Sequence, residues 1–110
     1  MNTINVILKG GLKSCCSSYS ADELKHYTRS WFDGIPEITF NIIDIENDFY
    51  DTGTAADTAY KYFGYSIFPL VYYNNQLVSL GRFPERNECF QIIEKPVPVT
   101  LEDIEEKARQ

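Results

Sequence analysis

The sequence predicts an α/β domain built on a four-stranded sheet of mixed strand direction. Short β-branched runs alternate with stretches of helical spacing. Asn74-Asn75 separates two of these runs, as in a tight hairpin turn. The 110 residues are the size of one compact domain. The predicted order is β-α-β-α-β-β-α with a short C-terminal helix, in which the first strand–helix–strand unit makes a parallel pair and the hairpin adds antiparallel strands.

The four predicted strands are short apolar segments bounded by turn residues. The first reads T-I-N-V-I-L, which is β-branched and apolar, and Gly10 and Gly11 end it. The second reads I-T-F-N-I-I-D-I, and the last two lie on either side of Asn74-Asn75. The predicted strands are residues 3–8, 38–45, 70–73 and 76–80.

The predicted helices begin at capping residues and end at glycine or proline. Ser20 and Glu23 have the spacing of a capping box, in which each side chain satisfies the other residue's backbone N–H. Apolar residues then continue at helical spacing to Trp31 and Phe32, so we expect this helix to run until Gly34. The other predicted helices are residues 54–63, residues 84–94 with Pro84 in the first turn, and residues 100–108.

The sequence divides into a predicted domain and a C-terminal tail. Residues 1–95 hold all the predicted strands and form the expected domain. Residues 96–110 form a tail that begins with Pro96 and Pro98, which make a stiff connection, and ends in an acidic helix.

Composition narrows the functional classes. The formal net charge of −6 disfavours nucleic acid as a partner, because phosphate binding relies on clustered Lys and Arg. No run of about 20 apolar residues predicts a membrane span, and the first residues lack the pattern of a signal peptide. Three cysteines without paired spacing fit free thiols in a reducing cytoplasm.

The main chemical signal is Cys15-Cys16, two adjacent thiols ahead of the first predicted helix. A disulfide between neighbours is strained, because their α-carbons lie about 3.8 Å apart and ordinary disulfides need about 4.4–6.8 Å. If the helix starts earlier than Ser20, the pair sits on its first turn, where free N–H groups lower a thiol pKa. Two adjacent thiolates could then hold one soft metal or metalloid ion.

Other interpretations of the cysteines remain open. Dithiol exchange is disfavoured, because Ser18 and Tyr19 stand where a Cys-x-x-Cys motif needs its second thiol. A catalytic role of Cys15 or Cys16 through a mixed disulfide with glutathione is an alternative. In the third interpretation the cysteines are small apolar residues without chemistry.

The element order and two details resemble the thioredoxin fold. The cysteines fall between the first strand and the first helix, where thioredoxin-like proteins keep their active thiols. Pro69, in S-I-F-P-L-V, opens the third strand, where that family keeps a cis-proline beside the thiols.

A closer resemblance is to the ArsD family of arsenic metallochaperones. The shared motifs are Cys15-Cys16-Ser17 and, after the hairpin, Gly81-Arg82-Phe83-Pro84-Glu85-Arg86. The resemblance implies binding of trivalent arsenic or antimony and delivery to the metal-transporting ATPase of an arsenite pump. Some members also act as weak repressors of their operon. The family's third cysteine corresponds to Ala21 here, so glutathione or a partner's thiol could supply the missing sulfur.

Three further residues are candidate parts of the site. Arg82 and Arg86 follow the fourth strand and could stabilise the thiolates or hold a glutathione carboxylate. The alternative is that both are ordinary exposed arginines. Cys89 could be a third ligand, but Phe90 and Ile93 beside it suggest the inward face of the third helix, so we expect it to be buried and not a ligand.

The leading hypothesis is therefore a small cytoplasmic ArsD-like protein that binds a soft metal or metalloid through Cys15 and Cys16 and delivers it to an acceptor protein. A glutaredoxin-like or thioredoxin-like thiol oxidoreductase is the alternative, and an interaction module without metal or redox chemistry is the third. A non-enzymatic role is favoured, no tightly bound cofactor is expected, and a homodimer is left open.

Overall fold

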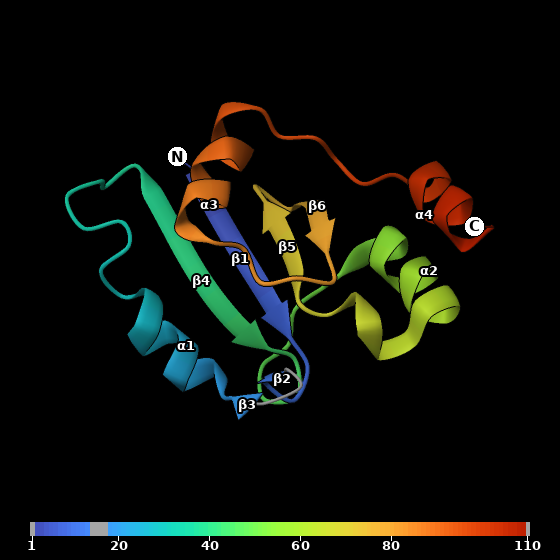
Figure 1. Cartoon of the computed structure of the whole chain (residues 1–110), viewed down its shortest axis with the longest axis horizontal. Coiled ribbons are helices and arrows are strands. Elements are labelled where there is room, and N and C mark those ends of the chain that lie inside the picture. The colour runs from blue at the N-terminus through green and yellow to red at the C-terminus, as the bar shows by residue number, and fades with distance from the viewer. Residues whose placement is uncertain (1, 14–17, 110) are drawn as a thin grey trace.

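The structure is a computed structural model that describes residues 2–13 and 18–109. Its main sheet has the strand order β4-β1-β5-β6 (Figure 1). β1 (Asn2–Leu8) pairs in parallel with β4 (Ile38–Asp44) and antiparallel with β5 (Leu70–Tyr73), which in turn pairs antiparallel with β6 (Gln76–Leu80). The predicted α/β class with a four-stranded mixed sheet is confirmed.

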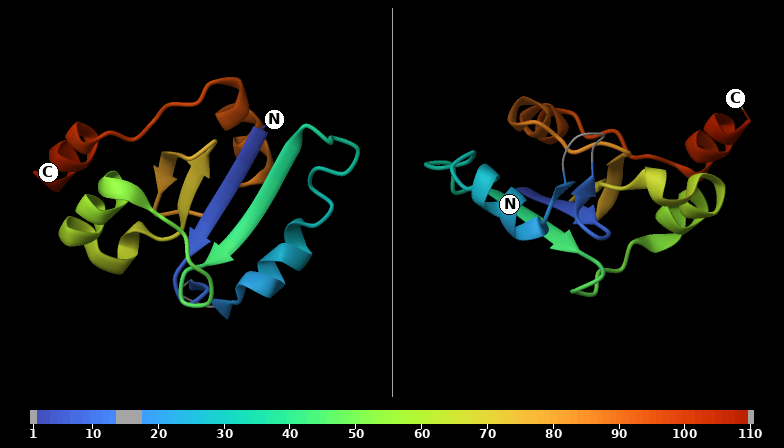
Figure 2. Two further views of the ribbon diagram at one scale, coloured as in Figure 1. Left: turned by 180° about the vertical axis from the view of Figure 1, so that it is seen from behind. Right: turned by 60° about the horizontal axis from the view of Figure 1, so that its bottom comes forward.

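Helices lie on both faces of this sheet (Figure 2). One cluster of buried side chains joins the sheet to α1 and α3, and a second joins it to α2, the following 3-10 turn and α4. The remaining elements are α1 (Ala21–Thr28), α2 (Gly53–Phe63), the 3-10 helix η1 (Gly64–Ile67), α3 (Arg86–Glu94), α4 (Leu101–Ala108), and the short strands β2 (Leu12–Lys13) and β3 (Ser18–Tyr19).

β1 is the centre of both clusters because successive side chains of a strand point to opposite faces. Ile4, Val6 and Leu8 enter the cluster with α1 and α3, whereas Ile7 enters the other, and all four side chains are fully buried. This double burial explains why T-I-N-V-I-L is almost continuously apolar.

The turn between β5 and β6 agrees with the prediction. Asn74 and Asn75 both have positive φ, 47° and 72°, as a type I′ hairpin turn requires. The Asn74 side chain accepts a hydrogen bond from the backbone N–H of Thr3 at 2.9 Å, and the backbone N–H of Asn74 donates to the Thr3 carbonyl at 2.9 Å. The turn is therefore tied to the start of β1.

Capping boxes are present at the starts of two predicted helices. Ser20 Oγ accepts from the N–H of Glu23 at 3.1 Å, and the Glu23 carboxylate accepts from the N–H of Ser20 at 3.1 Å. Thr100 and Asp103 make the same reciprocal pair at the start of α4. These two helix starts follow from local chemistry that the sequence alone contains.

The end of α1 was predicted wrongly. The helix ends at Thr28, well before Gly34, and its last residue turns its hydroxyl back to the carbonyl of Leu24 at 2.9 Å. The chain then continues in i→i+3 turns, from Trp31 to Thr28 and onward. In this tighter path Trp31 and Phe32 both pack onto the cluster beneath α1 and α3. A continued α-helix would not place both side chains on that cluster.

The start of α3 differs from the prediction by two residues. Glu85 is the N-cap and the helix begins at Arg86, so Pro84 lies ahead of the helix and not in its first turn. The Pro84 ring is fully buried. Packing of this ring, and not the helical preference of proline for a first turn, sets its position.

The C-terminal tail packs on the rest of the chain. The N–H of Val99 donates to the carbonyl of Leu77 at 2.8 Å, and Ile104 of α4 is 2% exposed within the cluster around α2. Among the described residues, every helix is too short or too polar to cross a membrane.

Candidate functional site

A small antiparallel hairpin brackets the predicted cysteine site. Leu12 of β2 pairs with Tyr19 of β3, and Lys13 pairs with Ser18. Cys15 and Cys16 belong to residues 14–17, which join Lys13 to Ser18 and lie outside the described residues. Their role as metal ligands, or as catalytic thiols, stays a prediction. Two-residue strands leave no alternating pattern in a sequence, so this hairpin was not foreseen.

α1 does not start earlier than Ser20, so the condition under which the cysteines would sit on its first turn is not met. Ser20 is the N-cap of α1 and has extended backbone angles, so the helix begins at Ala21. Residues 14–17 therefore precede the cap and are not part of the first turn. The reciprocal Ser20–Glu23 pair explains why the helix begins at Ala21, because it gives hydrogen-bond acceptors to the backbone N–H groups of Ser20 and Glu23. A helix that began earlier would need other acceptors for its first N–H groups.

Asp44 at the end of β4 holds the start of the hairpin in place. Its carboxylate accepts from the N–H groups of Gly11 at 2.8 Å, Glu46 at 3.0 Å and Gly10 at 3.1 Å. Burial alone would raise the pKa of Asp44, but these three donors together hold its pKa below the usual value of 3.8. The carboxylate thus fixes where the chain leaves β1 and enters the hairpin.

Gly11 is needed at this point for two reasons. Its φ is +80°, a conformation that L side chains rarely adopt. A Cβ on Gly11 would also lie 2.5 Å from the carbonyl oxygen of Tyr19, on the other arm of the hairpin. The missing side chain therefore lets β2 and β3 approach each other.

Pro69 and Lys13 line the same hollow, which has a volume of about 520 Å³. The Phe68–Pro69 bond is cis, as the resemblance implied, and Pro69 is buried at the start of β5. The hollow also involves Leu12, Glu46 and Ser66. Pro69 therefore lies beside the arm of the hairpin that leads into the cysteine pair.

Lys9 adds a cation to this hollow and is a candidate site residue that was not among those predicted from the sequence. Its ammonium lies 4.8 Å from the ring centre of Tyr65 and 5.2 Å from that of Tyr60, within cation–π range. A hydrogen bond from Tyr60 lowers the pKa of Tyr65 below 10.0, and the Lys9 charge acts in the same direction. The sequence feature that could have pointed to Lys9 is its position directly before Gly10-Gly11.

Arg82 and Arg86 have partners within their own surroundings. Arg82 Nη2 donates to Glu88 Oε1 at 2.7 Å, and Arg86 Nε donates to the carbonyl oxygen of Trp31 at 2.7 Å. The Arg86 guanidinium also lies 4.9 Å from the ring centre of Phe90. These contacts account for the positions of both arginine side chains, and no ligand is needed to explain them. The role of both residues toward the cysteines stays a prediction.

Cys89 is buried on α3 with no exposed surface, as predicted. Burial raises the pKa of its thiol to about 12, and the neighbouring Glu88 charge acts in the same direction. Figure 1 shows α3 over the half of β1 near the N-terminus, whereas the β2–β3 hairpin lies beyond the opposite end of β1. A thiol in this position is a poor thiolate donor to the hairpin.

Comparison with known proteins gives a fold likeness without a function. No family model matches the chain, and no curated protein matches it. A crystal structure of a protein of unknown function, SA0789 from Staphylococcus aureus, superposes with a TM-score of 0.54 and 18% sequence identity. The match covers 86% of this chain and 89% of that protein. At this level of identity the likeness concerns the fold alone.

We predict that Asp44→Asn destabilises the protein by about 2 kcal/mol near neutral pH, as expected for losing hydrogen bonds to a charged group. Because the folded-state pKa of Asp44 is lowered, its contribution is present above the unfolded-state pKa and disappears as the pH falls through the folded-state pKa. The difference in unfolding free energy between wild type and variant should therefore shrink in acid. Urea unfolding at several pH values measures it.

The control for this experiment is Asp48→Asn, which makes the same chemical change at an exposed position of the neighbouring loop. It should have little effect at any pH. Equal losses in Asp44→Asn and Asp48→Asn would contradict the role given to Asp44.

We predict that Gly11→Ala destabilises the protein more than Gly34→Ala does. The two glycines have nearly the same φ, +80° and +79°, but only Gly11 has a backbone atom within reach of an added Cβ. Gly34→Ala therefore measures the conformational strain alone, of about 1 kcal/mol. The extra loss in Gly11→Ala, read from thermal or urea unfolding, reports the close approach of the hairpin arms, and equal losses would disprove that approach.

We predict that Cys89 reacts slowly with a thiol reagent in the folded protein, because its thiol is buried and its pKa is raised to about 12. The folded chain should show two fast thiols and one slow thiol, and all three should react fast in urea. Cys89→Ala should remove only the slow phase and cost about 1 kcal/mol. Three fast thiols in the folded protein would place Cys89 at the surface.

Proposed function

We propose that this chain is a small cytoplasmic protein with a thioredoxin-like fold, similar to the ArsD metallochaperones. In this proposal Cys15 and Cys16 bind a soft metal or metalloid, such as trivalent arsenic or antimony. The chain then delivers this cargo to an acceptor such as a metal-transporting ATPase. The net charge of −6 disfavours nucleic acid as the partner.

The observation that carries this proposal is the hollow shared by Lys13 and Pro69. Lys13 is the last described residue before the segment that contains the two cysteines, and its partner Ser18 is the first described residue after it. The cysteine segment directly follows Lys13 in the chain, and Lys13 lines that hollow together with Pro69. This supports a thiol site next to Pro69, the arrangement that the thioredoxin resemblance implies.

The sheet supports the thioredoxin-like part of the proposal. A parallel β1–β4 pair is followed along the chain by an antiparallel β5–β6 hairpin, and helices cover both faces. The cysteine segment follows β1, and Pro69 directly precedes β5. These are the positions at which the resemblance places the thiols and the proline.

A complete three-sulfur site would need a thiol from outside this chain. Cys89 is buried on α3, and the described residues contain no group of three His, Cys, Asp or Glu side chains that could hold a metal ion. Glutathione or a cysteine of the acceptor protein could supply the third sulfur. Lys9 and Lys13, which line the hollow, would favour a thiol that carries carboxylates.

A thiol oxidoreductase of the glutaredoxin or thioredoxin type is the second candidate. The same hollow favours it, because a buried proline and two lysines beside a thiol would suit a glutathione mixed disulfide. It would use Cys15 or Cys16 alone, since no Cys-x-x-Cys pair exists.

We predict that the reduced protein binds trivalent arsenic or antimony, measured by titration calorimetry. Cys15→Ser and Cys16→Ser should each weaken binding at least about tenfold, a loss of about 1.4 kcal/mol or more, because each removes one of the two thiolates from this chain. Adding glutathione should strengthen binding to the wild type, since it can supply the third sulfur.

Cys89→Ala is the matched control, because it removes a thiol without touching the proposed site. It should leave the affinity for the metalloid nearly unchanged. Equal affinity in the wild type, Cys15→Ser and Cys16→Ser would refute the metal proposal. Reduction of a glutathione mixed disulfide by the protein, without metalloid binding, would favour the oxidoreductase instead.

A further inference from the structure

An apolar groove lies between α1 and the chain that enters α3. It has a volume of about 720 Å³ and is lined mainly by apolar side chains, which are those of Leu12, Tyr19, Leu24, Tyr27 and Phe83. Two of these side chains remain open to solvent, since Tyr19 is 43% exposed and Tyr27 is 71% exposed. An exposed apolar surface that is also concave is typical of a binding site.

The groove continues along α1 into a second hollow. Tyr27 and Phe83 line both, and the second hollow, of about 420 Å³, also involves Trp31 and Pro84. The Trp31 ring contacts Tyr27 and Phe83 edge to face, with its centre 5.9 Å and 6.3 Å from theirs. An open trough over two hollows suits an extended polypeptide segment, whereas a compact ligand needs a cleft that encloses most of its surface.

The end of the groove beside the hairpin is acidic. Asp22 and Glu23 line the groove and also an adjoining hollow, which includes Asp44 and Asp48. Lys25 is the one lysine or arginine that the described part of the chain places along these two hollows. Its ammonium lies 4.0 Å from Asp22, but the Asp22 side chain is 96% exposed, so this ion pair contributes little and leaves the carboxylate accessible. Four carboxylates and one ammonium favour a basic partner.

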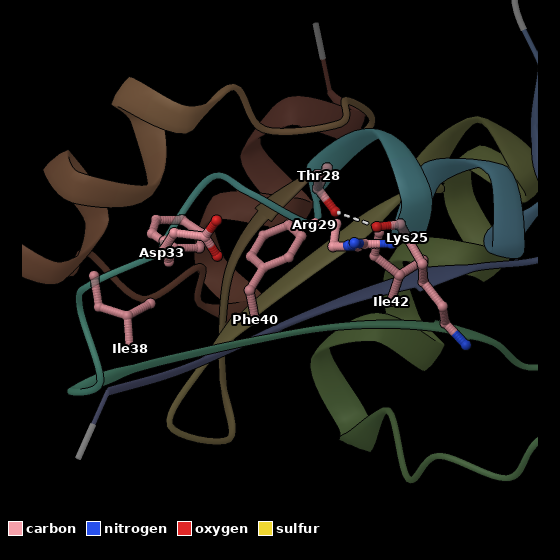
Figure 3. A pocket seen from close by; sticks show the side chains of 8 residues that line it. Lys25, Thr28, Arg29, Asp33, Ile38, Phe40 and Ile42 are labelled. Carbon is pink, nitrogen blue, oxygen red and sulfur yellow. Dashed lines mark hydrogen bonds between the residues drawn. The ribbon is translucent and has the colours of Figure 1, made fainter.

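The lysine and arginine side chains around α1 and the hairpin line other hollows. Lys25 and Arg29 line one of about 240 Å³ between α1 and β4, which Figure 3 shows. Lys9 and Lys13 line the hollow of Pro69. None of these four side chains lines the apolar groove itself, so Asp22 is the accessible charge at its edge.

The other end of the groove has no excess of either charge. Glu85 and Arg86 line it with opposite charges. The Arg86 guanidinium is already engaged, because its Nε donates to the Trp31 carbonyl at 2.7 Å and it lies over the Phe90 ring. His26 is the remaining polar residue of the first hollow. The groove therefore has an acidic end at the hairpin and an aromatic end at α3.

We propose that this groove binds an extended segment of a partner protein. Large apolar side chains of the segment pack on Tyr27 and Phe83, and a lysine or arginine of the segment lies against Asp22 and Glu23. Tyr19, at the acidic end, belongs to β3, which directly follows the cysteine segment in the chain. The partner is then the acceptor protein, an identification that rests on the function proposed above.

The test is an NMR titration of the reduced full chain, without metal, with synthetic peptides. One peptide has two lysines followed by Leu-Pro-Phe-Leu, and a second has two glutamates in place of the lysines. Each is also made in reverse order, because the groove does not fix the direction of the bound segment. The better lysine peptide should shift the amide signals of Tyr19, Tyr27 and Phe83 and bind at least about tenfold more tightly than either glutamate peptide.

Two variants at exposed positions test the two halves of the groove. Tyr27→Ser should weaken binding of the lysine peptide at least about fivefold, because it removes the most exposed ring. Asp22→Lys should weaken it about fivefold, because a like charge replaces an opposite one. The same variant should bind the glutamate peptide more tightly than the wild type does. Urea unfolding checks that both variants fold.

Tyr62→Ser and Glu102→Lys are the matched controls. Tyr62 is 54% exposed on α2, and Glu102 is an acid in the first turn of α4, as Asp22 is in the first turn of α1. Figure 1 shows α2 and α4 on the other side of the molecule from α1. Both controls should leave the affinity for the lysine peptide unchanged.

The proposal is overturned if no peptide binds, if the lysine and glutamate peptides bind equally, or if Tyr27→Ser and Tyr62→Ser lose the same affinity. Amide shifts that lie only outside the groove would also overturn it. The peptides carry no thiol and the buffer holds no metal, so the outcome is independent of metalloid binding by Cys15 and Cys16. Failure of the peptides would likewise leave the metalloid proposal standing.

Discussion

The arrangement around the hairpin depends on one buried carboxylate. Asp44 ends β4, yet its hydrogen bonds reach Gly10 and Gly11, which follow the neighbouring strand β1. A carboxylate that accepts from three N–H groups fixes three backbone positions at once, and the same three donors hold its pKa below the usual value. The direction in which the chain leaves the sheet, and so the place of the β2–β3 hairpin, follows from this contact.

The same corner of the molecule joins elements that are distant in sequence. Lys13 of β2 and Pro69 before β5 line one hollow, and Gly81 after β6 donates its N–H to the carbonyl of Pro69 at 3.1 Å. The candidate site is thus supported by the ends of several strands of a packed sheet.

Local patterns predicted most of the elements. The capping pairs of Ser20 and Thr100 gave the starts of α1 and α4, and Asn74-Asn75 gave the turn of the β5–β6 hairpin, because each depends on residues within a few positions. The end of α1 could not be predicted in this way. Trp31 and Phe32 leave helical geometry to pack on Phe40 and neighbouring side chains, which are supplied by other segments.

The sequence by itself determined the α/β class, the four strands, the burial of Cys89 and the adjacency of Cys15 and Cys16. Alternation, β-branching and composition are properties of neighbouring residues, so they can be read without a structure. Only the tertiary structure decided that Asp44 holds the Gly10-Gly11 turn, that Lys9 and Lys13 approach Pro69, and that Arg82 pairs with Glu88. These contacts depend on the order of strands in the sheet and on the path of each loop, which bring together residues whose separation in sequence gives no sign of their proximity.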